Sequence, residues 1–109
     1  MGAVTPLGLD LKTTWGNLMK AQSGIDYISL FDASSFPVKI AAEVKDFDES
    51  STGIPEEIEP FASRSTKLCV AAAQDAMKDA GLKLDSIDPA MFCISLGGNE
   101  ENSKLSNFK

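Results

Sequence analysis

The sequence predicts an α/β chain, and three stretches carry that prediction. Residues 65–84 repeat polar and apolar side chains with the 3.6-residue period of an α-helix. Residues 38–45 alternate apolar and charged side chains with the period of two that is typical of a half-exposed strand. Residues 91–96 form a short apolar run that indicates a buried strand. A chain of 109 residues has the length of one small domain, so these elements are expected to share one core.

The helix expected at 65–84 is the element around which the other segments are arranged. Its polar side chains fall on one narrow stripe, and its other faces are nearly all apolar. An apolar surface this wide exceeds the roughly 100° arc of an ordinary surface helix, and most of it is alanine, so we expect burial on two sides. Gly81 should end the helix in a left-handed position, with Leu82 completing a Schellman cap. The polar stripe consists of Arg64, Lys67, Gln74, Asp75 and Lys78.

A second helix is expected near the N-terminus, after a loop at residues 2–8 that contains a proline. Asp10 can cap this helix, and Ser23 with Gly24 should end it. Its apolar residues recur at i, i+4, i+7 and i+8, which predicts one buried face, and its tryptophan is interpreted as a core anchor rather than a ligand-stacking residue. The apolar residues are Leu11, Trp15, Leu18 and Met19.

Two strands are expected after this helix. The first is a short one at residues 25–30, and the second is the period-two stretch at 38–45. Pro37 stands immediately before the second strand and favours an edge position, because proline cannot donate to a strand ladder.

The segment at residues 43–59 holds seven acidic residues and only one lysine, Lys45. Paired carboxylates can form metal or acid–base sites, but these are loosely spaced among Ser, Thr, Gly and Pro. A solvated connecting loop is therefore favoured over a site. Pro55, followed by two glutamates, is expected to open a short helical turn.

Composition and charge exclude several classes of partner. Sixteen acidic against ten basic residues give a net charge of −6, which argues against binding to nucleic acid or to an anionic membrane surface. No apolar run approaches the roughly 18 residues of a membrane-spanning helix, and the N-terminus lacks the pattern of a secretory signal. We therefore expect an intracellular protein, cytoplasmic or in an organelle.

The residues themselves form no catalytic constellation. Histidine is absent, which removes Ser/His and Cys/His nucleophile pairs and leaves too few donors for a structural zinc site. Cys69 and Cys93 stand among apolar residues and are expected to be buried free thiols rather than a disulfide. Gly97 and Gly98 lack the spacing of a phosphate-binding loop. The sequence thus predicts no catalytic, cofactor-binding or metal-binding residue. Three methionines are interpreted as core fillers and not as a soft-metal site: Met19, Met77 and Met91.

Several short segments, taken in order, resemble the N-terminal part of the β-ketoacyl-acyl-carrier-protein synthases. The type II elongating enzyme of fatty acid synthesis is the most similar member, and the resemblance runs from about Gly2 to Leu96. Each motif alone is weak, and their order makes the match specific. The segments are GAVTPLG at 2–8, Trp15, SGI at 23–25, FD at 31–32, AEV at 42–44 with DFD at 46–48, AAA at 71–73 and DAGL at 79–82.

The resemblance implies a thiolase-like fold, in which buried helices lie between mixed β-sheets. It also implies a homodimer that takes an acyl chain from acyl carrier protein onto an active-site cysteine. Decarboxylative condensation with malonyl-acyl carrier protein then lengthens the chain by two carbons. This chemistry needs a thiolate with a lowered pKa, histidines and an oxyanion hole.

The sequence also departs from the family. The family's nucleophile lies in a Thr-Ala-Cys-Ser-like motif beyond residue 109, with two histidines further on, and neither Cys69 nor Cys93 matches that motif. Family members carry an apolar strand before the first loop, where Met1 stands here, and a longer glycine-rich turn where this chain has Gly97 and Gly98. Residues 1–109 are therefore expected to be an incomplete N-terminal β-ketoacyl synthase domain that is inactive alone.

Two alternatives remain at this point. One is a non-catalytic interaction module that keeps the same scaffold and binds a synthase or a carrier protein. The other is an unrelated small acidic α/β domain. Without the first strand, the alanine-rich helix would expose an apolar patch, so we also expect the isolated chain to self-associate or to be poorly soluble.

Overall fold

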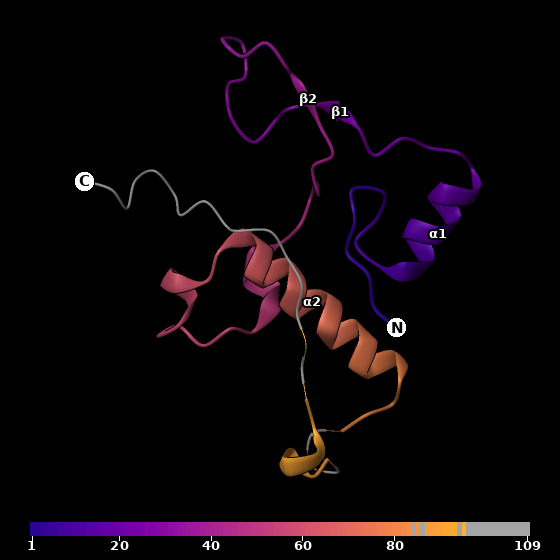
Figure 1. Cartoon of the computed structure of the whole chain (residues 1–109), viewed down its shortest axis with the longest axis vertical. Helices are drawn as coiled ribbons and strands as arrows, with labels where there is room; N and C mark the ends of the chain where they lie inside the picture. The colour runs from indigo at the N-terminus through magenta and orange to yellow at the C-terminus, as the bar shows by residue number, and fades with distance from the viewer. Residues whose placement is uncertain (84, 86, 94, 96–109) are drawn as a thin grey trace.

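The computed structural model describes residues 1–83, 85, 87–93 and 95, and in this part of the chain helices and strands are joined by long connecting segments (Figure 1). The coarse prediction of a mixed helix-and-strand chain is confirmed. The elements are α1 (Leu11–Met19), β1 (Asp26–Tyr27), β2 (Ile40–Ala41), η1 (Glu49–Thr52), η2 (Glu59–Phe61), α2 (Arg64–Asp79) and η4 (Pro89–Met91), where η denotes a 3₁₀-helix.

Helix α2 lies where the sequence predicts the central helix. The side chain of Ser63 caps it by accepting a hydrogen bond from the Thr66 amide at 3.1 Å. At the other end Gly81 has φ +65°. The amide of Gly81 donates to the carbonyl of Lys78 at 3.1 Å, and that of Leu82 donates to the carbonyl of Met77 at 3.0 Å. These two bonds make the Schellman motif, so the predicted stop is confirmed.

Helix α1 is also confirmed, together with its cap. The Asp10 carboxylate accepts hydrogen bonds from the amide and the hydroxyl of Thr13, each at 2.7 Å. The helix ends at Met19 rather than at Ser23 and Gly24, which corrects the predicted stop. Its last turn unwinds early because Ala21 takes a left-handed conformation, with φ 54°.

Both predicted strands are present, but each is only two residues long. β1 and β2 pair antiparallel, with Asp26 opposite Ala41 and Tyr27 opposite Ile40. Beyond this pairing a side chain supplies hydrogen bonds to the backbone: the Glu43 carboxylate accepts hydrogen bonds from the amides of Ser29 and Leu30 at 2.9 and 3.2 Å. The two-stranded ribbon forms an arm at one end of the molecule (Figure 1).

The N-terminal segment lies against α2, and the contact is a backbone contact. A Cβ placed on Gly2 would lie 2.0 Å from the carbonyl oxygen of Ala72 and 2.6 Å from the amide nitrogen of Ala76. The terminal ammonium of Met1 pairs with the carboxylate of Asp79. The N-terminal backbone thus comes close to this alanine-rich face of α2.

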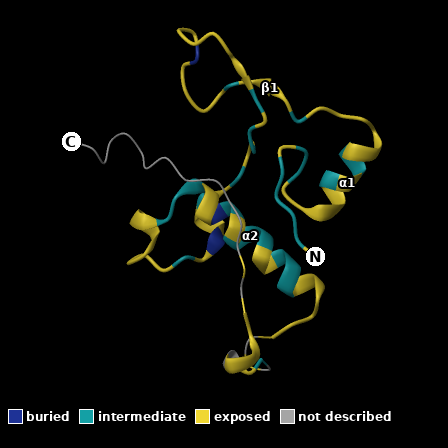
Figure 2. Ribbon diagram, in the orientation of Figure 1, coloured by how far each residue is buried: buried dark blue, intermediate teal, exposed yellow. Residues whose placement is uncertain are grey.

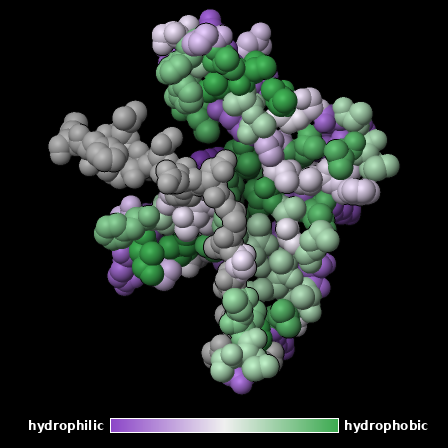
Figure 3. Space-filling view, in the orientation of Figure 1, coloured by the Kyte–Doolittle hydropathy of each residue, from purple (hydrophilic) through white to green (hydrophobic). Residues whose placement is uncertain are grey.

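The apolar faces of both helices are much less covered than the sequence predicts. Among the described residues the only buried apolar side chain is Ala33, and the only buried residue of α2 is Lys67 from its polar stripe (Figure 2). The predicted buried face of α1 is wrong, since Trp15 is 60% exposed and Leu18 52% exposed. On α2 the N-terminal segment covers part of the apolar face near Ala72, and most of the apolar residues there are half-buried. Figure 3 shows apolar surface along both the arm and the α2 region.

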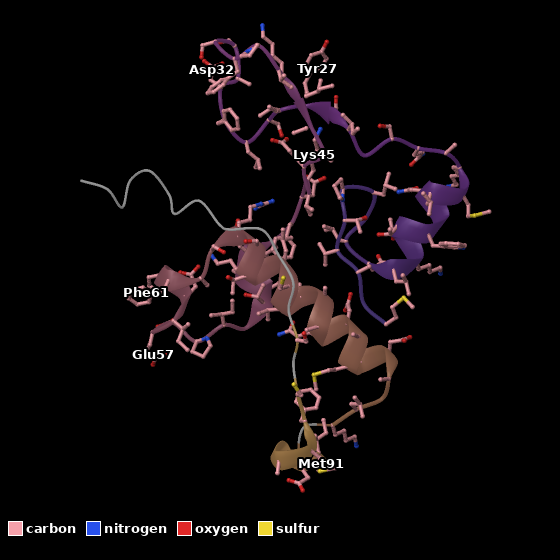
Figure 4. All side chains as sticks on the ribbon, in the orientation of Figure 1. Tyr27, Asp32, Lys45, Glu57, Phe61 and Met91 are labelled. Atoms are coloured by element: carbon pink, nitrogen blue, oxygen red, sulfur yellow. The ribbon has the colours of Figure 1, made fainter. Side chains whose placement is uncertain are left out.

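The cysteines and the predicted last strand also need correction. Cys69 and Cys93 are both exposed free thiols, not buried ones. Met91, Phe92, Cys93 and Ser95 are not in a strand, because a strand needs a ladder partner and none of the described segments supplies one. Met91 ends η4 and is 84% exposed (Figure 4), so it is not a core filler. The predictions for residues 97–109 lie outside the described residues.

Candidate functional site

The densest set of charged contacts joins α2 to the acidic segment that precedes it. We call the group Glu49, Glu59, Arg64 and Lys67 the charged junction. The Lys67 ammonium lies 3.0 Å from a carboxylate oxygen of Glu49 and 2.5 Å from one of Glu59. The Arg64 guanidinium donates to the other oxygen of Glu49 at 2.5 Å and to the Val44 carbonyl at 2.7 Å. Two cations of α2 thus meet two carboxylates from two other elements.

Local structure places each of these side chains. Asp48 caps η1 by accepting the Ser50 amide at 3.0 Å, which puts Glu49 at the first position of that turn. A turn over Pro55 leads into η2, where Glu59 is the first residue. In α2, Arg64 and Lys67 are three residues apart and share a face.

Burial and charge act together on Lys67. The residue is 6% exposed. Its hydrogen bond to Glu59, and to a smaller extent the one to Glu49, raises the pKa of the Lys67 ammonium. The hydrogen bonds that Glu49 accepts, first from Lys67 and second from Arg64, lower the pKa of the Glu49 carboxyl. Lys67 and Glu49 are therefore both charged at neutral pH. A lysine held protonated in this way is unsuited to act as a nucleophile or a general base.

Further polar contacts extend the junction along α2. The Gln74 amide donates to the carbonyl of Thr52 at 2.7 Å, and Thr52 is 3% exposed. The Arg64 guanidinium also lies 5.8 Å from the centre of the Phe47 ring. The acidic segment is thus bound to α2 at several points, while most of its residues are exposed, as expected for a solvated connecting loop.

An open hollow of about 370 Å³ lies between the N-terminal loop and Lys45. Its main polar groups already have partners: Thr5 bonds Thr14, Asp10 caps α1, and Lys45 pairs with Asp26 at 2.7 Å. The hollow offers no set of converging unpaired groups that would orient a ligand.

The exposed cysteines do not form a catalytic pair with a base. Cys69 lies on α2 and Cys93 follows η4, and the sequence contains no histidine to activate either thiol. Within the described residues no three His, Cys, Asp or Glu side chains are grouped so that they could hold a metal ion. The charged side chains of the described residues therefore hold segments of the chain together. No arrangement among these residues supports bond-breaking chemistry.

Sequence reasoning found half of the charged junction. It placed Arg64 and Lys67 on one helical stripe but assigned no partner to them. The signal that could have found the rest was the acidic segment directly before the helix, because two stripe cations next to seven acidic residues favour pairing. Glu49 and Glu59 were the residues missed.

None of the helices in the described part of the chain has both the length and the apolar character that crossing a membrane requires.

The fold and the charged junction define a helix-and-strand segment whose polar residues hold its own backbone together. Comparison with known proteins then gives the family. The family model of the β-ketoacyl synthase N-terminal domain matches residues 1–108 of the sequence, so the chain belongs to this family. The resemblance noted from the ordered motifs is confirmed.

Individual relatives agree with the family match. The chain is 38% identical over 85 residues to 3-oxoacyl-(acyl-carrier-protein) synthase 2 of Staphylococcus aureus, and the aligned region covers 78% of this chain and 21% of the relative. It is 34% identical over 101 residues to 3-oxoacyl-(acyl-carrier-protein) synthase 2 of Coxiella burnetii, and the aligned region covers 89% of this chain and 23% of the relative. The chain thus spans about a fifth of the length of the relatives it matches.

Proposed function

We propose that the chain is the N-terminal part of a 3-oxoacyl-acyl-carrier-protein synthase and serves its fatty-acid elongation reaction as scaffold. The observation that carries this proposal is the family match along residues 1–108, together with relatives named as synthase 2. The parent reaction is decarboxylative condensation of malonyl-acyl carrier protein with an acyl-enzyme thioester. Acyl carrier protein and a second synthase subunit are its partners, in the cytoplasm or an organelle.

The scaffold role rests on chemistry and on surface. The described residues contribute a protonated lysine and two exposed thiols, with no base to activate them, so residues 1–109 form an incomplete domain that is inactive alone. The same residues leave the apolar side chains of α1 exposed, including Trp15, Leu18 and Met19, and most of those of α2 only half-buried. In a thiolase-like fold these faces would be covered by sheets and neighbouring helices. Such burial would explain why α2 is rich in alanine.

Transfer from an acyl carrier protein provides the first test. The chain is incubated with acyl-acyl carrier protein thioester, and its intact mass is measured, with the full-length S. aureus synthase 2 as the positive control. We expect an acyl adduct on the control and none on this chain. An adduct that disappears in Cys69→Ser or Cys93→Ser would overturn the inactive-scaffold proposal and identify the nucleophile.

A chimera tests the scaffold role directly. The matching segment of the S. aureus synthase 2 is replaced by residues 1–95 of this chain, and condensation activity is measured. An active chimera supports the proposal, because it requires the foreign segment to pack correctly around the relative's catalytic residues. A chimera that folds and dimerises but does not condense would contradict it.

The exposed apolar surface also favours a second candidate, a non-catalytic module that binds a synthase or a carrier protein. The two candidates differ in what the isolated chain does. A module would bind acyl carrier protein or an intact synthase in a titration calorimeter. A scaffold segment alone would not.

A further inference from the structure

The contact between α2 and the acidic segment is held without a hydrophobic core. Three residues are buried in the described part of the chain, and two of them, Thr52 and Lys67, belong to this contact. Hydrophobic side chains nearby are largely exposed, with Ile58 at 56% and Phe61 at 86% (Figure 4). Charge pairing and hydrogen bonding therefore have to hold the segment in place.

We propose that the charged junction is an acid-sensitive latch, which holds residues 48–61 on α2 at neutral pH and releases them when acid removes the negative charge of the junction. Lys67 is the centre of the latch, since it contacts one carboxylate from η1 and one from η2. This inference concerns the chain's own residues and does not depend on the proposed function.

The charged groups that face Lys67 come from three elements. Glu49 reaches it from η1, Glu59 reaches it from η2, and Arg64 on α2 shares the Glu49 carboxylate. The nearby Asp48 carboxylate is occupied by the amide and the hydroxyl of Ser50, at 3.0 and 2.6 Å. The balance at the junction is thus two cations against two anions.

Acid changes this balance in one direction. The Glu49 pKa lies below the ordinary glutamate value of 4.5 in the folded chain, so its stabilising contribution is complete above that value. The contribution is lost as pH falls through the lowered pKa. Loss of negative charge at the junction leaves the nearly buried Lys67 ammonium with less counter-charge, and opening the segment lets water reach it.

Alkali acts only at a much higher pH. The Lys67 pKa is raised above its ordinary value of 10.5, so the lysine's contribution is complete below 10.5 and is lost only above the raised pKa. Between these limits the latch stays closed.

Amide hydrogen exchange of the full 109-residue chain tests the latch. Exchange at Ser51, Phe61 and Ala62, whose amides bond carbonyls within the segment, is followed from pH 7 to pH 3 and corrected for intrinsic rates. We expect acid to speed exchange at these amides by about tenfold. The amides of Gly81 and Leu82, in the cap at the far end of α2, are the internal reference and should change far less.

Variants at pH 7 separate the latch from general acid unfolding. Glu49→Gln with Glu59→Gln should reproduce the acid pattern at neutral pH. Glu56→Gln with Glu57→Gln removes the same charge from the same segment and should leave exchange unchanged. Equal effects of the two double variants would overturn the proposal, since they would show that only total charge matters.

Lys67→Met should abolish the acid response. Without the ammonium, Glu49 and Glu59 lose their shared partner, so the segment should be open at pH 7 and acid should no longer open it further. An undiminished acid response in Lys67→Met would overturn the latch. Should the variants fail to fold by circular dichroism, the wild-type titration still decides, because acid exchange that rises equally at Gly81 and Leu82 contradicts a local release.

Discussion

Gly2 lies directly against the backbone of Ala72 on α2. A Cβ at position 2 would come within 2.0 Å of the Ala72 carbonyl oxygen and 2.6 Å of the Ala76 amide nitrogen. Both neighbours are helical backbone and cannot move aside as a flexible side chain would. This contact joins the start of the chain to its central helix, although about seventy residues separate them in sequence.

Gly2→Ala is expected to separate the N-terminal segment from α2. Overpacking against backbone costs about 1–3 kcal/mol, and that loss should appear in the free energy of unfolding measured by urea titration. Gly16→Ala is the matched control, since Gly16 lies in α1 with open space around it and the change should stabilise the helix by about 1 kcal/mol. Equal effects of the two substitutions would show that the close approach does not exist.

Gly81→Ala should weaken the end of α2. Gly81 has φ +65°, a conformation that costs a residue with a Cβ about 1–2 kcal/mol. The expected result is a lower thermal midpoint and faster amide exchange at Leu82, whose amide closes the cap. Gly81→Asn should lose less, because asparagine tolerates the left-handed region better than alanine does. An alanine variant as stable as the wild type would contradict the Schellman cap.

Glu43→Gln should loosen the arm that carries β1 and β2. The Glu43 carboxylate accepts the amides of Ser29 and Leu30 and the Ser29 hydroxyl, and a neutral amide has only one oxygen to offer. We expect exchange at the Leu30 amide to rise about fivefold, while Lys39→Gln on the same arm leaves it unchanged.

The same carboxylate makes the arm sensitive to pH. Hydrogen bonds, first from the Ser29 amide, lower the pKa of Glu43 from its ordinary value of 4.5. Its stabilising contribution is therefore complete above 4.5 and is lost as pH falls through the lowered pKa. Acid should speed exchange at Leu30 in the wild type but not in Glu43→Gln; an identical acid response in both would argue against this role.

The exposed apolar face of α1 should make the isolated chain self-associate. Trp15 and Leu18 are more than half exposed, and such side chains, gathered on one helix face, favour contacts between molecules. Sedimentation velocity is expected to show a mass that grows with concentration, with Trp15 fluorescence shifting to shorter wavelength as the indole leaves water. Leu18→Glu should reduce the association, whereas Lys12→Gln, which changes net charge equally, should not. A monomer at every concentration would contradict the expectation.

The sequence was a good guide where structure depends on near neighbours. Asp10 caps α1 and Gly81 ends α2, because each of these roles involves backbone groups within one helical turn. Family membership was equally accessible, since it rests on the order of short motifs. The early end of α1 at Met19 was missed, because no residue near Ala21 in the sequence indicates that Ala21 takes a left-handed conformation.

The sequence by itself determined the positions of α1 and α2, the cap of α1 at Asp10, the stop of α2 at Gly81, and which family the chain belongs to. Only the tertiary structure decided which face of α2 is covered. The apolar faces were expected to be buried, yet the one buried residue of α2 in the described part of the chain is Lys67, which pairs with Glu49 eighteen residues away. Gln74, on the same polar stripe, bonds Thr52 twenty-two residues away. A helical period reveals that a helix has two kinds of face, but the burial of either face depends on partners that are distant in sequence.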